Sequence, residues 1–270
     1  MSNLSAERSR HALTEHTRRL TEAAGAADPT APVPTCPGWT VADLVAHVGQ
    51  TQHWVADIVE QRIADPALLP TEMAEVPADV SAWPAWLIDG GARVVAAFDD
   101  AALVEPVFNA AGDDRTGGVF WLQSQLNEAV IHGYDAAAAA LGDVVVDFDI
   151  DVDVAAELVT NHLAMLTSPT WAALRPESAT AVSGAGESLH WHADDLDSSG
   201  EWLIERGADG ATWQPGHGTA DATVRGPAGV LLLILTRRLP LTAVSPGVVR
   251  LVGDAELVGH WVANTAHIAD

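Results

Sequence analysis

Helical periodicity dominates the first half of the chain. Apolar residues recur at helical spacing over 41–64, directly after Thr40, a residue type that favours the N-cap position. Similar patterns predict helices over about 5–24, 83–98 and 118–141. The last of these ends before Gly142, and glycine is common just past the C-terminus of a helix. Helices of this number and length predict a four-helix bundle.

The pattern changes near residues 143–150. One more helix is expected over 151–166. After it, short segments separated by Gly and Asp turns predict strands, namely SLHWHAD, EWLIERG, ATWQPG, ADATVRG and VVRLVGD. A compact apolar helix within 226–239 and a last helix over 255–267 complete the pattern. The expected fold class is therefore a helical bundle over 1–145 followed by a smaller α+β domain over 146–270.

The charge balance narrows the range of partners. The chain has 13 basic and 37 acidic residues, a net charge of −24. We therefore expect no nucleic-acid partner and no binding to an anionic membrane surface. All basic residues are Arg, and the absence of Lys excludes Schiff-base chemistry and a P-loop lysine. With Cys36 as the only cysteine, an intrachain disulfide and a Cys-rich zinc site are also excluded.

Apolar runs are short throughout the sequence. The N-terminal segment MSNLSAERSRHALTEH is polar, and the longest dense apolar stretch covers only 230–235. Neither a signal peptide nor a transmembrane helix is expected from these segments. We predict a cytoplasmic protein that is a monomer or a homodimer.

A polar stripe crosses the apolar surface of the helix predicted over 118–141. Glu128 and His132 are four residues apart and share a helix face, and Asp135 falls on the same stripe. Apolar residues flank the stripe on both sides, so this is not the pattern of a solvated face. A buried carboxylate and imidazole need compensation, which a metal ion can supply. The alternative is an ordinary surface Glu–His pair.

His47 is the best candidate for a third metal ligand. It lies at the edge of the apolar stripe of the helix predicted over 41–64, from which it could point between helices. Two histidines and one glutamate leave an open position on Zn²⁺, as a catalytic zinc site requires. The open position could hold water or a thiol. An ordinary, partly buried histidine is the other interpretation of His47.

Two histidines alternate with a tryptophan in a predicted strand. His190 and His192 would share one face of that strand, with Trp191 on the other. This spacing suits a metal site, although an ordinary exposed strand face is the more common reason for it. His217, between two glycines, is expected in a loop.

Several other residue types allow both a functional and a structural interpretation. Cys36 precedes a predicted helix, where a thiol is either activated by the helix N-terminus or simply packs the loop against the bundle. Trp54 follows His47 by seven residues, so it lines a pocket on the same face or packs in the core. His11 and His16 on the first helix could approach the same bundle core, but we expect them at its surface.

Ordered blocks of the sequence resemble the mycothiol-dependent maleylpyruvate isomerase family. VPTCPGWTVADLVAHVGQTQHWV at 33–55 resembles the opening signature of that family, and NEAVIHGYDAAAAALG at 127–142 resembles its second signature. Downstream, SLHWHADDLDSSGEWLIERG, ADATVRGPAGVLLLILTRRLP and LVGDAELVGHW resemble its C-terminal domain. The resemblance spans nearly the whole chain. It implies a DinB-like four-helix bundle followed by a domain related to sterol-carrier folds.

The resemblance also implies a cofactor set. A divalent metal, usually zinc, would be held by the positions that match His47, Glu128 and His132. A small thiol, mycothiol, would occupy the open position and become the thiolate nucleophile. Gly133 and Tyr134 stand where family members often show Arg-Trp, which leaves the identity of the substrate open.

Further site residues complete the hypothesis. As catalytic residues we predict Asp135, which would orient a metal ligand, and Arg238, which matches an Arg after the apolar C-terminal helix of the family. As cofactor-binding residues we predict Trp54 and Arg237. Either arginine could clamp a carboxylate of the substrate or of the thiol, and a surface salt bridge is the alternative.

The sequence thus predicts an enzyme that depends on a metal and on mycothiol. It would be an isomerase or S-transferase acting on a small electrophilic, carboxylate-bearing substrate. In the isomerase version, reversible addition of the thiolate to a cis double bond permits rotation before elimination. Two alternatives stay open, a metal-dependent hydrolase without a thiol and a non-catalytic small-molecule-binding protein.

Overall fold

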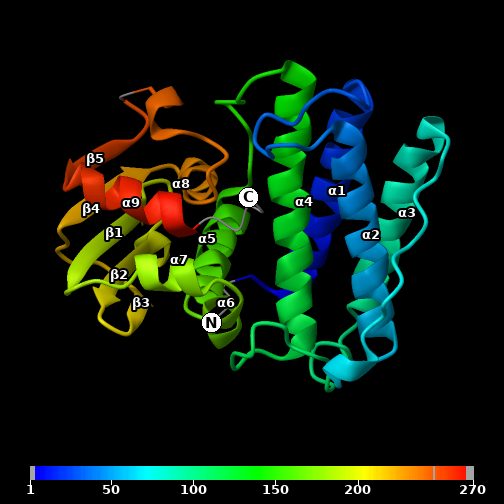
Figure 1. The fold of residues 1–270 in the computed structure, drawn as a ribbon, viewed down its shortest axis with the longest axis horizontal. Coiled ribbons are helices and arrows are strands. Elements are labelled where there is room, and N and C mark those ends of the chain that lie inside the picture. Colours follow the sequence, from blue (N-terminus) through cyan, green and yellow to red (C-terminus); the bar gives the residue numbers. More distant parts are fainter. Residues whose placement is uncertain (1–3, 246, 266–270) are drawn as a thin grey trace. The chain divides into compact units, whose positions relative to one another are not determined.

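The computed structural model describes residues 4–245 and 247–265. This part of the chain forms two compact units, 4–145 and 146–265. The fold class expected from the sequence, a helical bundle followed by a smaller α+β unit, is confirmed (Figure 1). Of the helices in the described residues, none combines the length and the apolar character needed to cross a bilayer.

The first unit is built on long helices that stand side by side (Figure 1). In the described part of that unit they are α1 (Ala6–Ala26), α2 (Val41–Glu60), α3 (Trp83–Ala97) and α4 (Gly117–Leu141). Short 3-10 turns cover Pro66–Leu68 and Val80–Ala82. Helix α1 packs against α3 and α4, and α2 packs against the same two helices. The core between these helices consists of fully buried aliphatic side chains, among them Leu13, Leu20, Leu44, Val55, Ile58, Val94 and Leu126.

Local signals fix the start of α2. The Thr40 side chain accepts a hydrogen bond from the Asp43 amide, and the Asp43 carboxylate accepts one from the Thr40 amide, which makes a capping box. The preceding loop folds back on itself, since the Val33 amide donates to the Trp39 carbonyl at 2.9 Å. Gly38 has a φ of 82°, a conformation that L side chains rarely adopt. The loop thereby places residues 35–39 directly beside the first turn of α2.

Close packing of glycines fixes the start of α4. A Cβ atom added to Gly117 would lie 2.0 Å from the Val107 carbonyl oxygen, and one added to Gly118 would lie 2.0 Å from the Ala102 carbonyl oxygen. The helix ends at Gly142, whose φ of 75° is the left-handed conformation of a helix C-cap. Between these ends α4 runs without a break and carries the predicted metal ligands.

The second unit contains a mixed sheet. Its strands in the described residues are β1 (Glu187–Ala193), β2 (Glu201–Gly207), β3 (Gly210–Pro215), β4 (Ala222–Gly226) and β5 (Arg250–Gly253). They lie in the order β3-β2-β1-β4-β5, and the β1–β4 pair is parallel while the other pairs are antiparallel. The helices of this unit are α5 (Val152–Leu166), α6 (Pro169–Leu174), α7 (Pro176–Ala181), α8 (Ala228–Leu235) and α9 (Ala255–Thr265). Short 3-10 turns cover Ser198–Gly200 and Leu241–Ala243.

The two faces of the sheet differ in polarity. Leu189, Trp191 and Ala193 of β1 are fully buried on one face. Their register partners on β2 and β4 continue this apolar face, and α8 packs against β1 and β4. His190 and His192 point to the opposite face, as the alternation predicted.

The sequence missed a few elements. It did not predict α6 and α7, which are only six residues long each. The compact apolar helix expected within 226–239 is present, at Ala228–Leu235. The last predicted helix reached residue 267, and positions 266 and 267 lie outside the described residues.

Candidate metal centre

Helices α2 and α4 bring three possible metal ligands together. Nε2 of His47 lies 3.0 Å from Oε2 of Glu128, and Nε2 of His132 lies 3.1 Å from the same oxygen. The donor atoms of the three residues all lie within 4.8 Å of one another. The sequence predicted these three residues as ligands, and the fold brings them together.

The surroundings leave this cluster open on one side. The side chains of His47, Glu128 and His132 are 38%, 26% and 10% exposed. A small molecule can therefore reach the donors, while the helices behind them hold the rings in place. Such access is needed if water, a thiol or a substrate is to occupy an open coordination position on a bound metal.

Asp135 supports His132 from behind. It is fully buried, and its Oδ2 lies 2.8 Å from Nδ1 of His132. Because a carboxylate can only accept, Nδ1 carries the proton and Nε2 is the atom turned towards Glu128. The Thr35 hydroxyl donates to Oδ1 of Asp135 at 2.5 Å, and the Cys36 thiol lies 3.3 Å from Oδ2. A carboxylate behind a ligating histidine fixes its tautomer and ring orientation.

The loop before α2 also supplies an aromatic cover. The Trp39 ring stacks on His132 with centroids 5.9 Å apart and planes 21° apart. It also contacts the His47 ring, at 5.0 Å between centroids. Trp39 therefore restricts both imidazoles to the orientations that face Glu128.

The contacts within the cluster shift the pKa values of Glu128 and His132. Burial acts against the charged form of Glu128, but hydrogen bonds from the His132 and His47 rings outweigh it and hold the pKa of this carboxyl well below its usual range. Burial likewise acts against protonated His132, yet its hydrogen bonds to Asp135, Cys36 and Glu128 raise the pKa of the ring well above its ordinary value. The centre is thus a site that attracts positive charge.

The donor set fits a divalent first-row metal. Imidazole and carboxylate ligands suit Zn²⁺ and its neighbours in the series. Zinc bonds of about 2.0–2.1 Å in a tetrahedral arrangement place neighbouring donors about 3.3 Å apart. The 3.0 and 3.1 Å separations at Glu128 are close to that spacing. A bound cation would take the place of the Nε2 protons that the two rings now direct at the carboxylate.

The remaining predicted site residues have other surroundings. Trp54 donates from Nε1 to the Pro70 carbonyl at 2.9 Å, and its ring meets the Trp121 ring edge-on at 5.4 Å. Arg237 is exposed and has a φ of 60°. Arg238 is buried, and its Nη1 donates to the Thr236 carbonyl at 3.1 Å. Both arginines belong to the unit 146–265. Their predicted roles, and that of Trp54, stay predictions.

Sequence reasoning missed part of the support around the centre. It did not single out Thr35 or Trp39, although both stand in the segment that carries the family resemblance. It left Cys36 open between two interpretations, and the structure shows a buried thiol beside Asp135. His16, expected at the surface, is 2% exposed.

Fold and site together define a class of two-unit proteins, in which a helical bundle presents two histidines and a glutamate and a mixed sheet follows. Residues 10–137 match the family described as the mycothiol maleylpyruvate isomerase N-terminal domain. The matched segment contains the whole metal-donor cluster, so the bundle of this chain is similar to that N-terminal domain. The resemblance stated from the sequence is thereby confirmed.

Solved structures extend the likeness to the rest of the chain. A crystal structure of the mycothiol-dependent maleylpyruvate isomerase matches with a TM-score of 0.55 at 17% identity, over 94% of this chain and 95% of that one. A histidine-to-alanine mutant of the same enzyme matches over the same shares with a TM-score of 0.56 and 17% identity. At this identity the likeness is one of fold. No curated protein sequence matches the chain.

Proposed function

We propose that this protein is a metal- and mycothiol-dependent isomerase or S-transferase that acts on a small, electrophilic, carboxylate-bearing substrate. The observation that carries the proposal is the convergence of His47, Glu128 and His132 on one another within the segment that matches the family. The fold likeness to mycothiol-dependent maleylpyruvate isomerase over nearly the whole chain supports the same assignment. We further propose zinc as the metal, domains over 1–145 and 146–270, and a cytoplasmic location.

Each residue of the centre has a distinct part in this proposal. His47, Glu128 and His132 would hold the metal, and a bound divalent metal supplies the positive charge that lowers the pKa of a coordinated thiol. Asp135 keeps the Nδ1 proton of His132, so that Nε2 is free to be a ligand. Glu128 adds a negative charge that favours a cation over a neutral ligand. Trp39 holds the two imidazoles and shields one side of the centre from water.

The arginines and Trp54 are proposed to handle substrate and thiol. Guanidinium groups bind carboxylates in a bidentate manner, so Arg237 and Arg238 would recognise a carboxylate of substrate or cofactor. Exposed Arg237 can be changed without disturbing the packing, and Arg237→Ala should raise KM with little change in kcat. Trp54 would contribute apolar surface to thiol binding, and Trp54→Phe tests this through the affinity for mycothiol.

Metal content is the first test. Untagged protein purified without chelator should contain zinc, as measured by elemental mass spectrometry. His47→Ala and His132→Ala should each lower this zinc content. His53→Ala is the matched control on α2, because His53 lies outside the cluster and stacks on Trp86. Retention of the same metal by His47→Ala, His132→Ala and Glu128→Ala would remove the centre from the proposal.

Thiol dependence is the second test. Metal-loaded protein should be stabilised by mycothiol in a thermal-shift titration, because a ligand that binds the folded state raises the melting temperature. It should also convert maleylpyruvate, or a related cis-unsaturated acid, only when mycothiol is present. Turnover of a substrate with bound metal but without thiol would favour a metal-dependent hydrolase. Absence of any turnover together with a co-purified ligand would favour a small-molecule-binding protein.

A further inference from the structure

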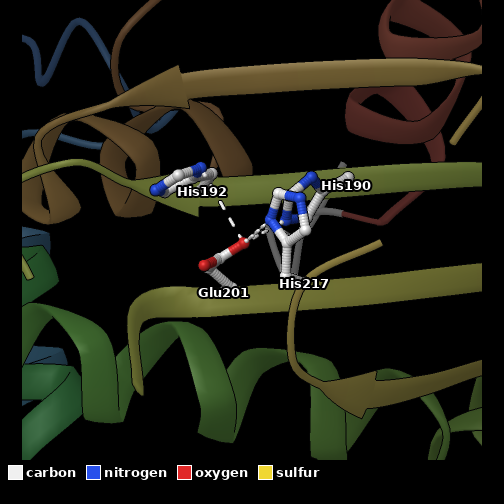
Figure 2. A group of neighbouring side chains, drawn as sticks. All are labelled: His190, His192, Glu201 and His217. Atoms are coloured by element: carbon white, nitrogen blue, oxygen red, sulfur yellow. Dashed lines mark hydrogen bonds and ion pairs between the residues drawn. The ribbon is translucent and has the colours of Figure 1, made fainter. Parts of the chain in front are cut away.

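A second group of metal-ligating side chains lies on the sheet, outside the centre described above. It consists of His190, His192, Glu201 and His217 (Figure 2). His190 and His192 come from β1, Glu201 begins β2, and His217 lies in the segment after β3. In Figure 2 the rings of His190 and His217 lie on one side of the Glu201 carboxylate and the ring of His192 on the other, and dashed lines join them to it. The family match at 10–137 does not include any of them.

The topology of the sheet places these residues together. His190 and His192 are two apart on one strand and share a face, while fully buried Trp191 occupies the other. The antiparallel register of β1 and β2 sets Glu201 directly opposite His192. His217 follows Gly216, which has a φ of 126° and whose amide donates to the Glu201 carbonyl at 2.9 Å, at the start of β2.

All three imidazoles converge on one carboxylate oxygen. Oε2 of Glu201 lies 3.0 Å from Nε2 of His190, 2.7 Å from Nδ1 of His217 and 3.8 Å from Nδ1 of His192. The donor atoms of all four residues lie within 4.8 Å of one another. These separations bracket the spacing of about 3.3 Å between the donors of tetrahedral zinc. A small inward shift of the donors is enough to surround a cation.

Burial makes this arrangement unusual for a simple surface cluster. The side chains of His190 and Glu201 are only 3% and 10% exposed, and that of His192 is 19% exposed. His217 is 75% exposed and closes the group from the solvent side. Buried ionisable groups need a partner that compensates their lost hydration. A cation held by all four residues provides it at one point, whereas one carboxylate oxygen cannot accept good hydrogen bonds from three rings at once.

We propose that His190, His192, Glu201 and His217 form a second metal site, which binds a first-row divalent cation, with zinc as the favoured ion. Three imidazoles and one carboxylate fill a tetrahedral shell and exclude the oxygen-preferring Mg²⁺ and Ca²⁺. A shell closed by four protein ligands is that of a structural site. The ion would tie the segment that contains His217 to strands β1 and β2. The proposal is independent of the function assigned to the bundle.

Metal stoichiometry of the full, untagged chain tests the proposal. With zinc as the probe, equilibrium dialysis followed by elemental mass spectrometry should find two ions per chain in the wild type. His217→Ala and His192→Ala should each leave one, and Glu128→Gln should also leave one. The double variant Glu128→Gln with His217→Ala should bind none. His260→Ala, which removes an exposed histidine of the same unit outside the cluster, should keep both ions.

The same experiment separates the two sites. If the bundle binds no metal, the wild type holds one ion, Glu128→Gln keeps it and His217→Ala loses it, so the sheet site stands although the proposed function fails. A wild type with a single ion that Glu128→Gln removes would overturn the sheet site. A second ion retained in both His217→Ala and His192→Ala would overturn it as well. Because His217 is largely exposed, its replacement tests binding without removing a core residue, and circular dichroism checks that the fold is kept.

A spectroscopic readout distinguishes a bound ion at the sheet from adventitious binding. In the Glu128→Gln background, Co²⁺ should give the intense visible absorption of a four-coordinate site. His217→Ala should reduce that absorption to the level of free Co²⁺. Weak absorption in the Glu128→Gln background itself would show that the four residues do not enclose the ion.

Discussion

Replacing Asp135 by asparagine tests the central piece of the reasoning about the metal centre. The two side chains have the same shape, so the buried position stays filled. Asparagine keeps one oxygen, which can still accept from Nδ1 of His132, and its amide group can turn towards the Thr35 hydroxyl. The main change is therefore the loss of a negative charge 2.8 Å behind a metal ligand.

The expected magnitude follows from that geometry. Mutation of the group behind a ligating histidine costs roughly 10–100-fold in metal affinity. With about 1.4 kcal/mol for each factor of ten, this is about 1.4–2.8 kcal/mol. Because Asp135 is fully buried and its contact with His132 is charge-assisted, we expect the upper half of this range. Asp135→Ala should be more harmful, since it also leaves the Nδ1 proton of His132 without an acceptor.

A competition assay measures the effect. Zinc is titrated into a mixture of the protein and a chromophoric chelator of known affinity, in the His217→Ala background so that the bundle is measured alone. Thr35→Val is the matched control, because it removes the hydrogen bond to the other carboxylate oxygen and leaves the His132–Asp135 contact intact. We expect Thr35→Val to weaken binding less than tenfold. Asp135→Asn with unchanged zinc affinity, alongside loss of zinc in His132→Ala, would refute the role assigned to Asp135.

Three further predictions concern stability. Gly117→Ala should destabilise the bundle by about 1–3 kcal/mol in urea unfolding, because the new Cβ meets the Val107 carbonyl. Gly25→Ala in α1 is the control: its new Cβ meets nothing within 4 Å, so the change should be neutral or stabilising by about 0.5 kcal/mol. Thr40→Ala should cost about 1 kcal/mol through loss of the capping box. A hydrogen bond from the Thr40 side chain lowers the pKa of the Asp43 carboxyl. This stabilisation is therefore present above about pH 4 and is lost as the pH falls through the lowered pKa. The difference in the free energy of unfolding between wild type and Thr40→Ala should shrink in acid. Chelator treatment should lower the melting temperature of zinc-loaded protein. Zinc added back at about 100 times its Kd should restore about 2.7 kcal/mol of the free energy of unfolding. An unchanged melting temperature would contradict zinc binding to the folded state.

The helices of the bundle could be predicted because their signals are local. Thr40 and Gly142 mark helix ends through hydrogen bonds and backbone angles within a few residues, and the observed ends agree. The strands were equally visible in alternating segments such as 187–193. Helices α6 and α7 were not, because six residues are too few to show a helical period.

The same distinction applies to the two clusters. Glu128 and His132 are four residues apart and share one face of α4 whatever packs around the helix, so their spacing predicted the pair. Thr35 and Trp39 reach the centre only because a loop folds back, which no periodicity shows. Glu201 joins His192 through the register of the β1–β2 pair, and that register depends on the connection between the strands. Sequence spacing therefore found the His190–His192 pair and missed its carboxylate.

The placement of donors along α4 has a consequence for the order in which the metal centre assembles. Glu128, His132 and Asp135 lie within two turns, so they come into place as soon as that one helix forms. His47 is 81 residues away from Glu128, and it arrives only when α2 docks on α4. A nascent α4 can thus offer two donors to an ion early, and the third donor appears in a later, topologically distant step. The rate of tight metal binding during refolding would therefore report the docking of α2 on α4, and not the formation of the helices.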